Sequence, residues 1–194
     1  MPTFPQMLAA YDQVLADTAA LASRVRSLAV PTPCADWDLA DLFGHMVGQN
    51  LGFAAAVTDG DAPIAAYASV PITLDDYDRQ WRDSADTIRE AFHGADPEAT
   101  VHLAEFDFAA TATVALGMQL LDAAVHAWDV AMALGTDYRP GTATVDHVHA
   151  MARQIASRPG GTPVFGPPLA EDGDDPWSDG LRLLGRDPSR HVGV

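Results

Sequence analysis

Apolar residues recur at spacings of three and four along most of the chain, which is the pattern of amphipathic helices. The pattern predicts helices over residues 4–27, from Asp36 or Asp38 to 57, over 73–93, from Thr111 or Thr113 to 134, over 142–157 and over 176–184. Residues 100–109 alternate weakly, as expected of one short strand or an extended loop. Long helices in this proportion predict an all-α four-helix bundle with an additional short helix near the C-terminus.

The second predicted helix carries a glycine at every fourth position, namely Gly44, Gly48 and Gly52. A glycine inside a soluble helix costs about 1 kcal/mol relative to alanine. Three of them on one face therefore indicate that another part of the molecule, or a ligand, approaches this face closely. The backbone of another helix is the expected neighbour, and access for a ligand is the alternative.

The chain shows no internal repeat and no change of composition that marks a domain boundary. Helical periodicity ends at Arg158, and clusters of proline and glycine follow. We expect residues 1–158 to form the helical bundle and residues 159–194 to be an extension packed on it, within one domain.

Charge excludes two classes of partner. The 194 residues carry 27 acidic and 11 basic side chains, all of the latter arginine, for a net charge of -16. A surface this acidic repels nucleic-acid phosphates and anionic lipid heads. No apolar run approaches the roughly 20 residues that a membrane span requires. We therefore expect neither nucleic acid nor membrane as a partner.

The sequence also indicates a compartment. Its single cysteine, Cys34, has no partner within the chain for a disulfide, which suits a reducing environment. The N-terminus lacks a basic stretch followed by an apolar segment, so no secretory signal is expected. A cytoplasmic location follows as the expectation.

Candidate chemistry centres on Asp122 and His126, which lie four residues apart in the almost entirely apolar segment 118–134. On a helix this spacing places both side chains on one face, which here is expected to look inward. A buried carboxylate and imidazole are costly unless they are paired or bound to a metal. His45, on another predicted helix, would complete a three-residue cation site with open positions. A hydrogen-bonded Asp122–His126 pair without metal is the alternative.

Three further residues are candidates for a role at the site, and two of them have two readings. Asp129, three residues after His126, either orients that histidine as a hydrogen-bond acceptor or forms a salt bridge in helix packing. Cys34 is either a fourth ligand or nucleophile, or a small buried apolar residue. His102 is the one other histidine that could line a pocket, whereas His147, His149 and His191 are expected on the surface.

Three stretches resemble the DinB-like and YfiT-like metal-binding bundles, and in particular the branch that contains the N-terminal domain of mycothiol-dependent maleylpyruvate isomerase. They are TPCADWDLADLFGH at 32–45, DAAVHAWD at 122–129, and FGPP at 165–168 with LLGRDP at 183–188. The resemblance implies a DinB-like bundle in which His45, Asp122 and His126 bind a divalent metal, zinc or nickel. Asp122 departs from the branch, where glutamate is expected, and we expect its shorter side chain to change the affinity for the metal or the identity of the metal.

The resemblance also implies a reaction type. A low-molecular-weight thiol such as mycothiol would be activated by the metal and attack a small electrophile, as in a thiol-dependent transferase or isomerase. The alternative is a non-catalytic metal- or ligand-binding protein that acts through dimerisation, as a homodimer. No residue is identified as a separate acid or base.

Overall fold

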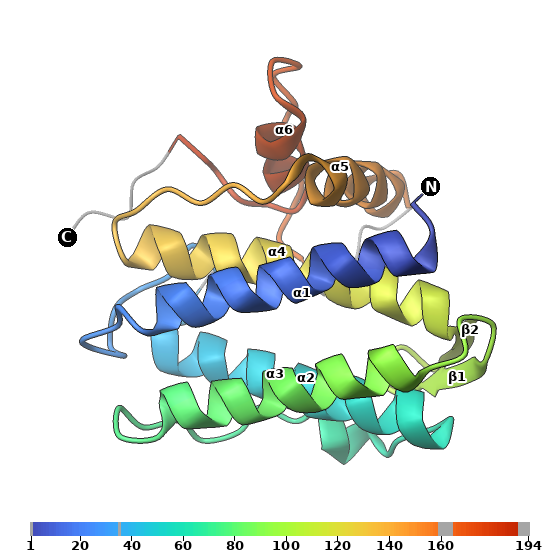
Figure 1. Ribbon diagram of the computed structural model, residues 1–194. Coiled ribbons are helices and arrows are strands. Elements are labelled where there is room, and N and C mark those ends of the chain that lie inside the picture. The colour runs from blue at the N-terminus through green and yellow to red at the C-terminus, as the bar shows by residue number, and fades with distance from the viewer. Residues whose placement is uncertain (1, 35, 159–164, 190–194) are drawn as a thin grey trace.

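Long amphipathic helices dominate the computed structural model, which describes residues 2–34, 36–158 and 165–189 (Figure 1). The four long helices are α1 (Phe4–Ala22), α2 (Leu39–Asp59), α3 (Tyr77–Gly94) and α4 (Ala112–Ala133), followed by α5 (Thr142–Ala156) and α6 (Pro176–Leu183). A short 3-10 helix, η1 (Ile64–Tyr67), and two strands, β1 (Thr100–Leu103) and β2 (Phe108–Thr111), complete the described elements. The expected all-α, DinB-like four-helix bundle is confirmed.

Helix α4 lies at the centre of the fold. It contacts α1, α2 and α5. The hairpin β1–β2 covers the end of the bundle at which α4 begins (Figure 1). Helices α5 and α6 pack on each other outside the bundle, beside α1 and α4. Because α4 has neighbours on nearly every side, it is apolar almost all round, and its polar residues Gln119, His126 and Asp129 are buried.

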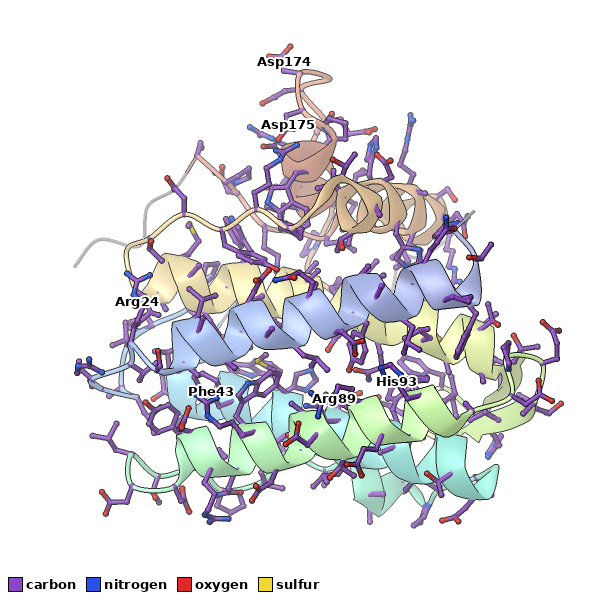
Figure 2. All side chains as sticks on the ribbon, in the orientation of Figure 1. Arg24, Phe43, Arg89, His93, Asp174 and Asp175 are labelled. Atoms are coloured by element: carbon purple, nitrogen blue, oxygen red, sulfur yellow. The ribbon has the colours of Figure 1, made fainter. Side chains whose placement is uncertain are left out.

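An aromatic cluster joins α2 to α3. Phe43 lies between these helices, with ring centroids 5.6 Å from Tyr77 and 6.3 Å from Trp81 (Figure 2). At the surface, His93 at the end of α3 pairs with Asp12 of α1 at 3.0 Å. The alternation of apolar and charged positions along α3 therefore separates a packed face from a solvated one, as its sequence predicts.

Helix α1 ends earlier than its apolar pattern predicts, at Ala22 and not at residue 27. The Ser23 hydroxyl donates to the Ala20 carbonyl and the Arg24 amide to the Leu21 carbonyl, so the chain turns here. Val25 remains buried in the turn. Apolar spacing continues past the helix because the same core receives the following residues.

The segment 100–109 contributes to a hairpin and not to a single strand. Strands β1 and β2 pair antiparallel, with Thr100 opposite Thr111 and Leu103 opposite Phe108. Asp107 adopts a left-handed conformation (φ 51°) in the turn between them. The second strand escaped prediction because it runs directly into α4, whose cap Thr111 is also its last residue.

The glycine face of α2 is covered by the short helix η1 and the segment that follows it, so the expected backbone of another long helix is wrong. A Cβ atom at Gly48 would lie 2.4 Å from the Ala68 carbonyl oxygen, and one at Gly44 would lie 2.5 Å from that of Val70. The Val70 amide donates to the Gly44 carbonyl at 3.1 Å. Gly44 and Gly48 therefore make room for the chain that leaves η1, and Gly52 makes room for the Tyr67 ring of η1, so protein atoms fill the space.

The described part of the C-terminal segment, 165–189, packs through α6 against α5, and the Trp177 indole donates to the Tyr138 carbonyl at 3.3 Å. The division into 1–158 and 159–194 within one domain stays a prediction, and residues 159–164 and 190–194, including His191, lie outside the described part. Among the helices of the described residues, none has the length and apolar character needed to cross a membrane.

Candidate metal centre

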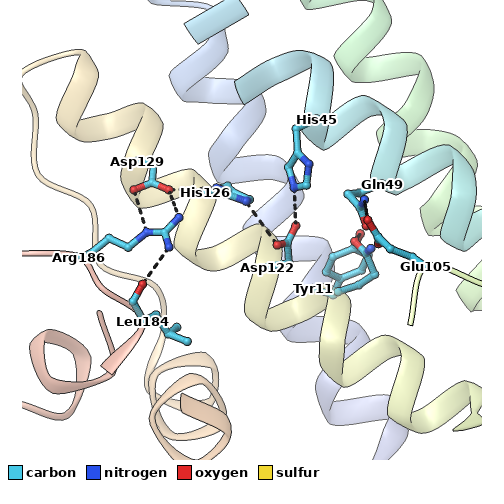
Figure 3. Close-up of polar contacts among 10 residues, drawn as sticks. Tyr11, His45, Gln49, Glu105, Asp122, His126, Asp129, Leu184 and Arg186 are labelled. Atoms are coloured by element: carbon cyan, nitrogen blue, oxygen red, sulfur yellow. Dashed lines mark hydrogen bonds and ion pairs between the residues drawn. The ribbon is translucent and has the colours of Figure 1, made fainter. Parts of the chain in front are cut away.

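Packing of α2 on α4 brings His45, Asp122 and His126 together, as Figure 3 shows. His45 projects from α2, and the other two project from successive turns of α4. Each offers a ligand atom, and these three atoms all lie within 4.8 Å of one another. The tertiary structure thus joins the two sequence signatures at one point.

The spacing suits a small cation. Asp122 Oδ2 lies 3.9 Å from His45 Nε2, and Asp122 Oδ1 lies 3.4 Å from His126 Nε2. A tetrahedral ion with ligands at 2.0–2.2 Å requires ligand atoms about 3.4 Å apart. The imidazole centroids are 5.0 Å apart with planes at 76°, so both rings direct a nitrogen toward the carboxylate without stacking.

Exposure differs among the three side chains. His126 is 4% exposed, whereas His45 and Asp122 are 22% and 19% exposed. The site is therefore closed behind His126 and accessible beside the other two residues. A cation held here would keep contact with solvent or with a small ligand.

Burial and charge set the protonation of the three groups. Burial lowers the pKa of His45 to about 4, so its imidazole is neutral at pH 7 and ready to bind a metal. At Asp122 and His126, burial shifts each pKa in the direction opposite to its net change, and neighbouring charges outweigh it. Asp122 and Asp129 raise the pKa of His126 to about 9, and His126 and His45 hold the pKa of Asp122 at about 2. Without metal, Asp122 and His126 form an ion pair.

Asp129 lies behind His126, on the side away from Asp122. Its Oδ2 is 3.0 Å from His126 Nδ1 and 2.9 Å from Arg186 Nη2 (Figure 3). Asp129 thus contacts the histidine and also forms a salt bridge, and its role in orienting a metal ligand stays a prediction. Arg186 is a residue that sequence reasoning did not single out. Arg186 lies in the LLGRDP stretch, 57 positions from Asp129, and nothing in the sequence indicated that these two residues pair.

Trp37 forms a wall of the site and was likewise missed. Its ring centroid lies 4.9 Å from that of His45 and 6.3 Å from that of His126. The loop before α2 places it there, because the Thr32 amide donates to the Trp37 carbonyl at 2.9 Å and Asp36 turns the chain with φ 64°. The clue in the sequence was its position in the first signature.

A second polar group lies on the other side of Asp122. Gln49 of α2 donates to the Glu105 carboxylate at 3.0 Å, across from Tyr11 (Figure 3). Burial and the charge of Asp122 raise the pKa of Glu105. The same two causes, burial first, raise the pKa of the Tyr11 phenol, which donates to Gln119 at 3.3 Å.

Cys34 and His102 differ in their relation to the site. The Cys34 sulfur lies with ligand atoms of His126 and Asp129 in a group whose members are within 4.8 Å, on the closed side. Burial raises the pKa of this thiol to about 11, so it is neutral at pH 7. His102 is on β1 and pairs with Asp61 at 2.8 Å. It takes no part in the centre.

A third convergence of ligand atoms involves His149, Glu171 and Asp179, between α5 and α6. These groups already have partners. Glu171 is 3.2 Å from His149 Nε2 and 3.5 Å from Arg153 Nε, and Asp179 accepts backbone amides of the preceding loop. His147, expected on the surface with His149, is half-buried against the Gly117 carbonyl at 2.8 Å.

Comparisons with known proteins identify a family model and a solved structure that are similar to this chain. Residues 8–131 match the family model described as "Mycothiol maleylpyruvate isomerase N-terminal domain". A comparison with curated proteins finds no match at the significance required. Among solved structures, a histidine-to-alanine variant of the mycothiol-dependent maleylpyruvate isomerase is similar, with a TM-score of 0.66 and 14% sequence identity.

That similarity covers 80% of this chain and 72% of the isomerase chain, and at 14% identity it establishes the fold alone. The family match establishes more, because it spans most of the bundle and both helices that carry the candidate ligands. The chain belongs to the mycothiol maleylpyruvate isomerase N-terminal domain family.

Proposed function

We propose that this protein binds one divalent metal ion, zinc or nickel, through His45, Asp122 and His126 and uses the centre in a thiol-dependent transfer or isomerisation. The observation that carries the proposal is the convergence of three ligand atoms, from two helices, within 4.8 Å. Two imidazoles and one carboxylate are a donor set that zinc and nickel accept.

The residues fit such an ion in charge as well as in spacing. His45 is neutral at pH 7 because burial lowers its pKa, and Asp122 is ionised. His126 carries the one proton that binding must displace, at Nε2, while its Nδ1 keeps the hydrogen bond to Asp129. When bound, a divalent ion supplies Lewis-acid chemistry that lowers the pKa of a coordinated thiol or water.

Thiol dependence is supported by the family and by the openness of the site. The related isomerase is named as mycothiol-dependent, and the family carries the same thiol in its description. Partial exposure of His45 and Asp122 leaves room for a small ligand on that side. Trp37 offers an apolar face, and the Gln49–Glu105 pair offers polar groups to the thiol or its electrophile.

Metal content is the first test. Protein purified without added metal is analysed for zinc and nickel, as wild type, His126→Ala and the control His147→Ala, whose histidine is half-buried elsewhere. We expect about one equivalent in wild type and in the control, and none in His126→Ala. Absence of metal from wild type, with no uptake on refilling, would leave a buried Asp–His ion pair and overturn the proposal.

Thiol binding separates the catalytic from the non-catalytic reading. Cobalt-substituted protein is titrated with mycothiol, and the visible spectrum is followed. A spectral change that saturates supports a site open to thiols. An unchanged spectrum, with metal retained, shows a closed centre and favours a binding protein; a dependence of sedimentation on protein concentration then tests dimerisation.

A further inference from the structure

We propose that Arg186 is a positioning residue of the metal centre and acts on His126 through Asp129. The inference rests on the metal site proposed above and names a residue outside it. Through Asp129, Arg186 joins the C-terminal segment to His126, the most deeply buried of the three proposed ligands. Arg186 contacts Asp129, and Asp129 contacts the imidazole of His126.

The three side chains form a continuous buried chain of contacts. Asp129 is fully buried, and Arg186 is 4% exposed. Arg186 reaches both carboxylate oxygens, from Nη2 at 2.9 Å and from Nε at 3.4 Å (Figure 3). The oxygen that Nη2 contacts also lies 3.0 Å from His126 Nδ1. The guanidinium therefore holds the carboxylate in the orientation that meets the imidazole.

The backbone around Arg186 is shaped for this contact. Its amide donates to the Leu181 carbonyl at 2.9 Å, and its Nη1 donates to the Leu184 carbonyl at 3.0 Å. Gly185 has φ 79°, and a Cβ atom there would lie 2.8 Å from Gly166. The chain thus leaves α6 through a turn that only glycine adopts without strain, and this turn directs Arg186 inward.

Fixing the carboxylate fixes the histidine. With Nδ1 donating to Asp129, the lone pair available for a metal lies on Nε2, which faces Asp122 at 3.4 Å. Outer carboxylates that orient ligand histidines typically change metal affinity by about 10- to 100-fold when removed. Asp129 without Arg186 keeps its charge but loses the fork of donors that sets its rotation.

A merely structural role predicts something different. In that case the ion pair would hold the C-terminal segment in place, and any other contact of that segment would matter equally. Arg182 provides the comparison, because it pairs with Asp172 within the same segment and, in the described part of the chain, forms no side-chain hydrogen bond or ion pair with the metal centre. Zinc affinity distinguishes these roles.

The test measures zinc affinity by competition with a chromophoric chelator. We expect about a 10- to 100-fold loss for Arg186→Met, an intermediate value for Arg186→Lys, and the wild-type value for Arg182→Met. Unchanged affinity in Arg186→Met, or an equal loss in Arg182→Met, would overturn the positioning role alone. A wild type that binds no zinc would overturn this role together with the proposed function.

A measurement on the wild type covers the case in which Arg186→Met does not fold. Nitrogen-15 spectra of the zinc-loaded protein report which ring nitrogen of His126 holds the proton. The proposal requires a protonated, hydrogen-bonded Nδ1 and zinc on Nε2. Zinc on Nδ1, or a His126 ring without a hydrogen bond at that nitrogen, contradicts it.

Discussion

Asp129 and Arg186 lie 57 positions apart in the chain and form a buried ion pair, with Oδ2 and Nη2 2.9 Å apart. Asp129 belongs to α4 at the centre of the bundle, and Arg186 follows α6 outside it. The same carboxylate contacts His126, so a single side chain belongs both to the attachment of the C-terminal segment and to the candidate metal centre.

This pair makes a prediction about stability. Arg186→Met leaves Asp129 buried without its main counter-charge, which typically costs 3–5 kcal/mol, and His126 nearby places the expected loss at about 3 kcal/mol. The double variant Asp129→Leu/Arg186→Met should recover most of that loss, because it removes the unpaired carboxylate while His126 keeps Asp122 as its partner. Urea unfolding of the metal-free protein measures both. Arg139→Met, which breaks the exposed pair with Asp175, should cost about 1 kcal/mol or less; equal losses for the two arginines would contradict the prediction.

Opposite shifts at the two histidines predict a stability maximum in the metal-free protein. The pKa of His45 falls from 6.5 to about 4, so between these values only the unfolded chain binds its proton and stability falls as pH falls. The pKa of His126 rises from 6.5 to about 9, so its contribution is complete below pH 6.5 and is lost as pH rises to 9. These two groups together place the maximum near pH 6.5.

Chemical unfolding at a series of pH values measures this profile. His45→Ala should flatten the acid side, and His126→Ala should flatten the alkaline side. A metal-free protein whose stability rises steadily from pH 6.5 to 9 would show that His126 does not hold its proton.

Metal binding should release a proton. At pH 7.5 His126 is protonated, because its pKa is about 9, whereas His45 is neutral. Loading one divalent ion should therefore expel about one proton. Calorimetric titration in buffers of different ionisation enthalpy counts it. A heat of binding that is the same in all buffers, after correction for the metal's own buffer complexes, rules out displacement from His126.

The raised pKa of Cys34 predicts an unreactive thiol. At a pKa of about 11, against an ordinary 9.0, the thiolate fraction near neutral pH is about 100-fold lower, and alkylation should slow in proportion. Iodoacetamide labelling of native and denatured protein measures the ratio. Cys34→Ala should keep the wild-type metal content, since the thiol belongs to the closed side of the centre; loss of metal would identify the sulfur as a ligand.

The glycine face of α2 predicts a packing defect. Gly48→Ala places a Cβ atom 2.4 Å from the Ala68 carbonyl oxygen, and the backbone shift needed should cost about 1–3 kcal/mol. Gly94→Ala, at the end of α3, meets no atom within 4 Å and should change stability by no more than about 1 kcal/mol, in the favourable direction. Thermal unfolding of both variants provides the test, and a harmless Gly48→Ala would contradict the close approach.

The helices and the relation of Asp122 to His126 could be predicted because both depend on local spacing. Residues four apart on a helix share a face whatever surrounds it, and α4 keeps this face directed inward. The choice of His45 needed more than spacing: it drew on the expected cost of an unpaired buried site and on the resemblance to a known family. The structure places His45 beside the other two, and metal binding itself stays a prediction.

Contacts between distant segments were decided by tertiary packing alone. Trp37 reaches the centre through a loop with a left-handed Asp36, and Arg186 reaches Asp129 through the turn at Gly185. The α2 glycines meet η1 and the segment after it, and not another long helix. Periodicity along a chain states which face of a helix is buried, but not which segment buries it. That choice depends on how all the segments pack together, so the sequence by itself determined the helices and one face of the site, and only the folded chain determined what surrounds it.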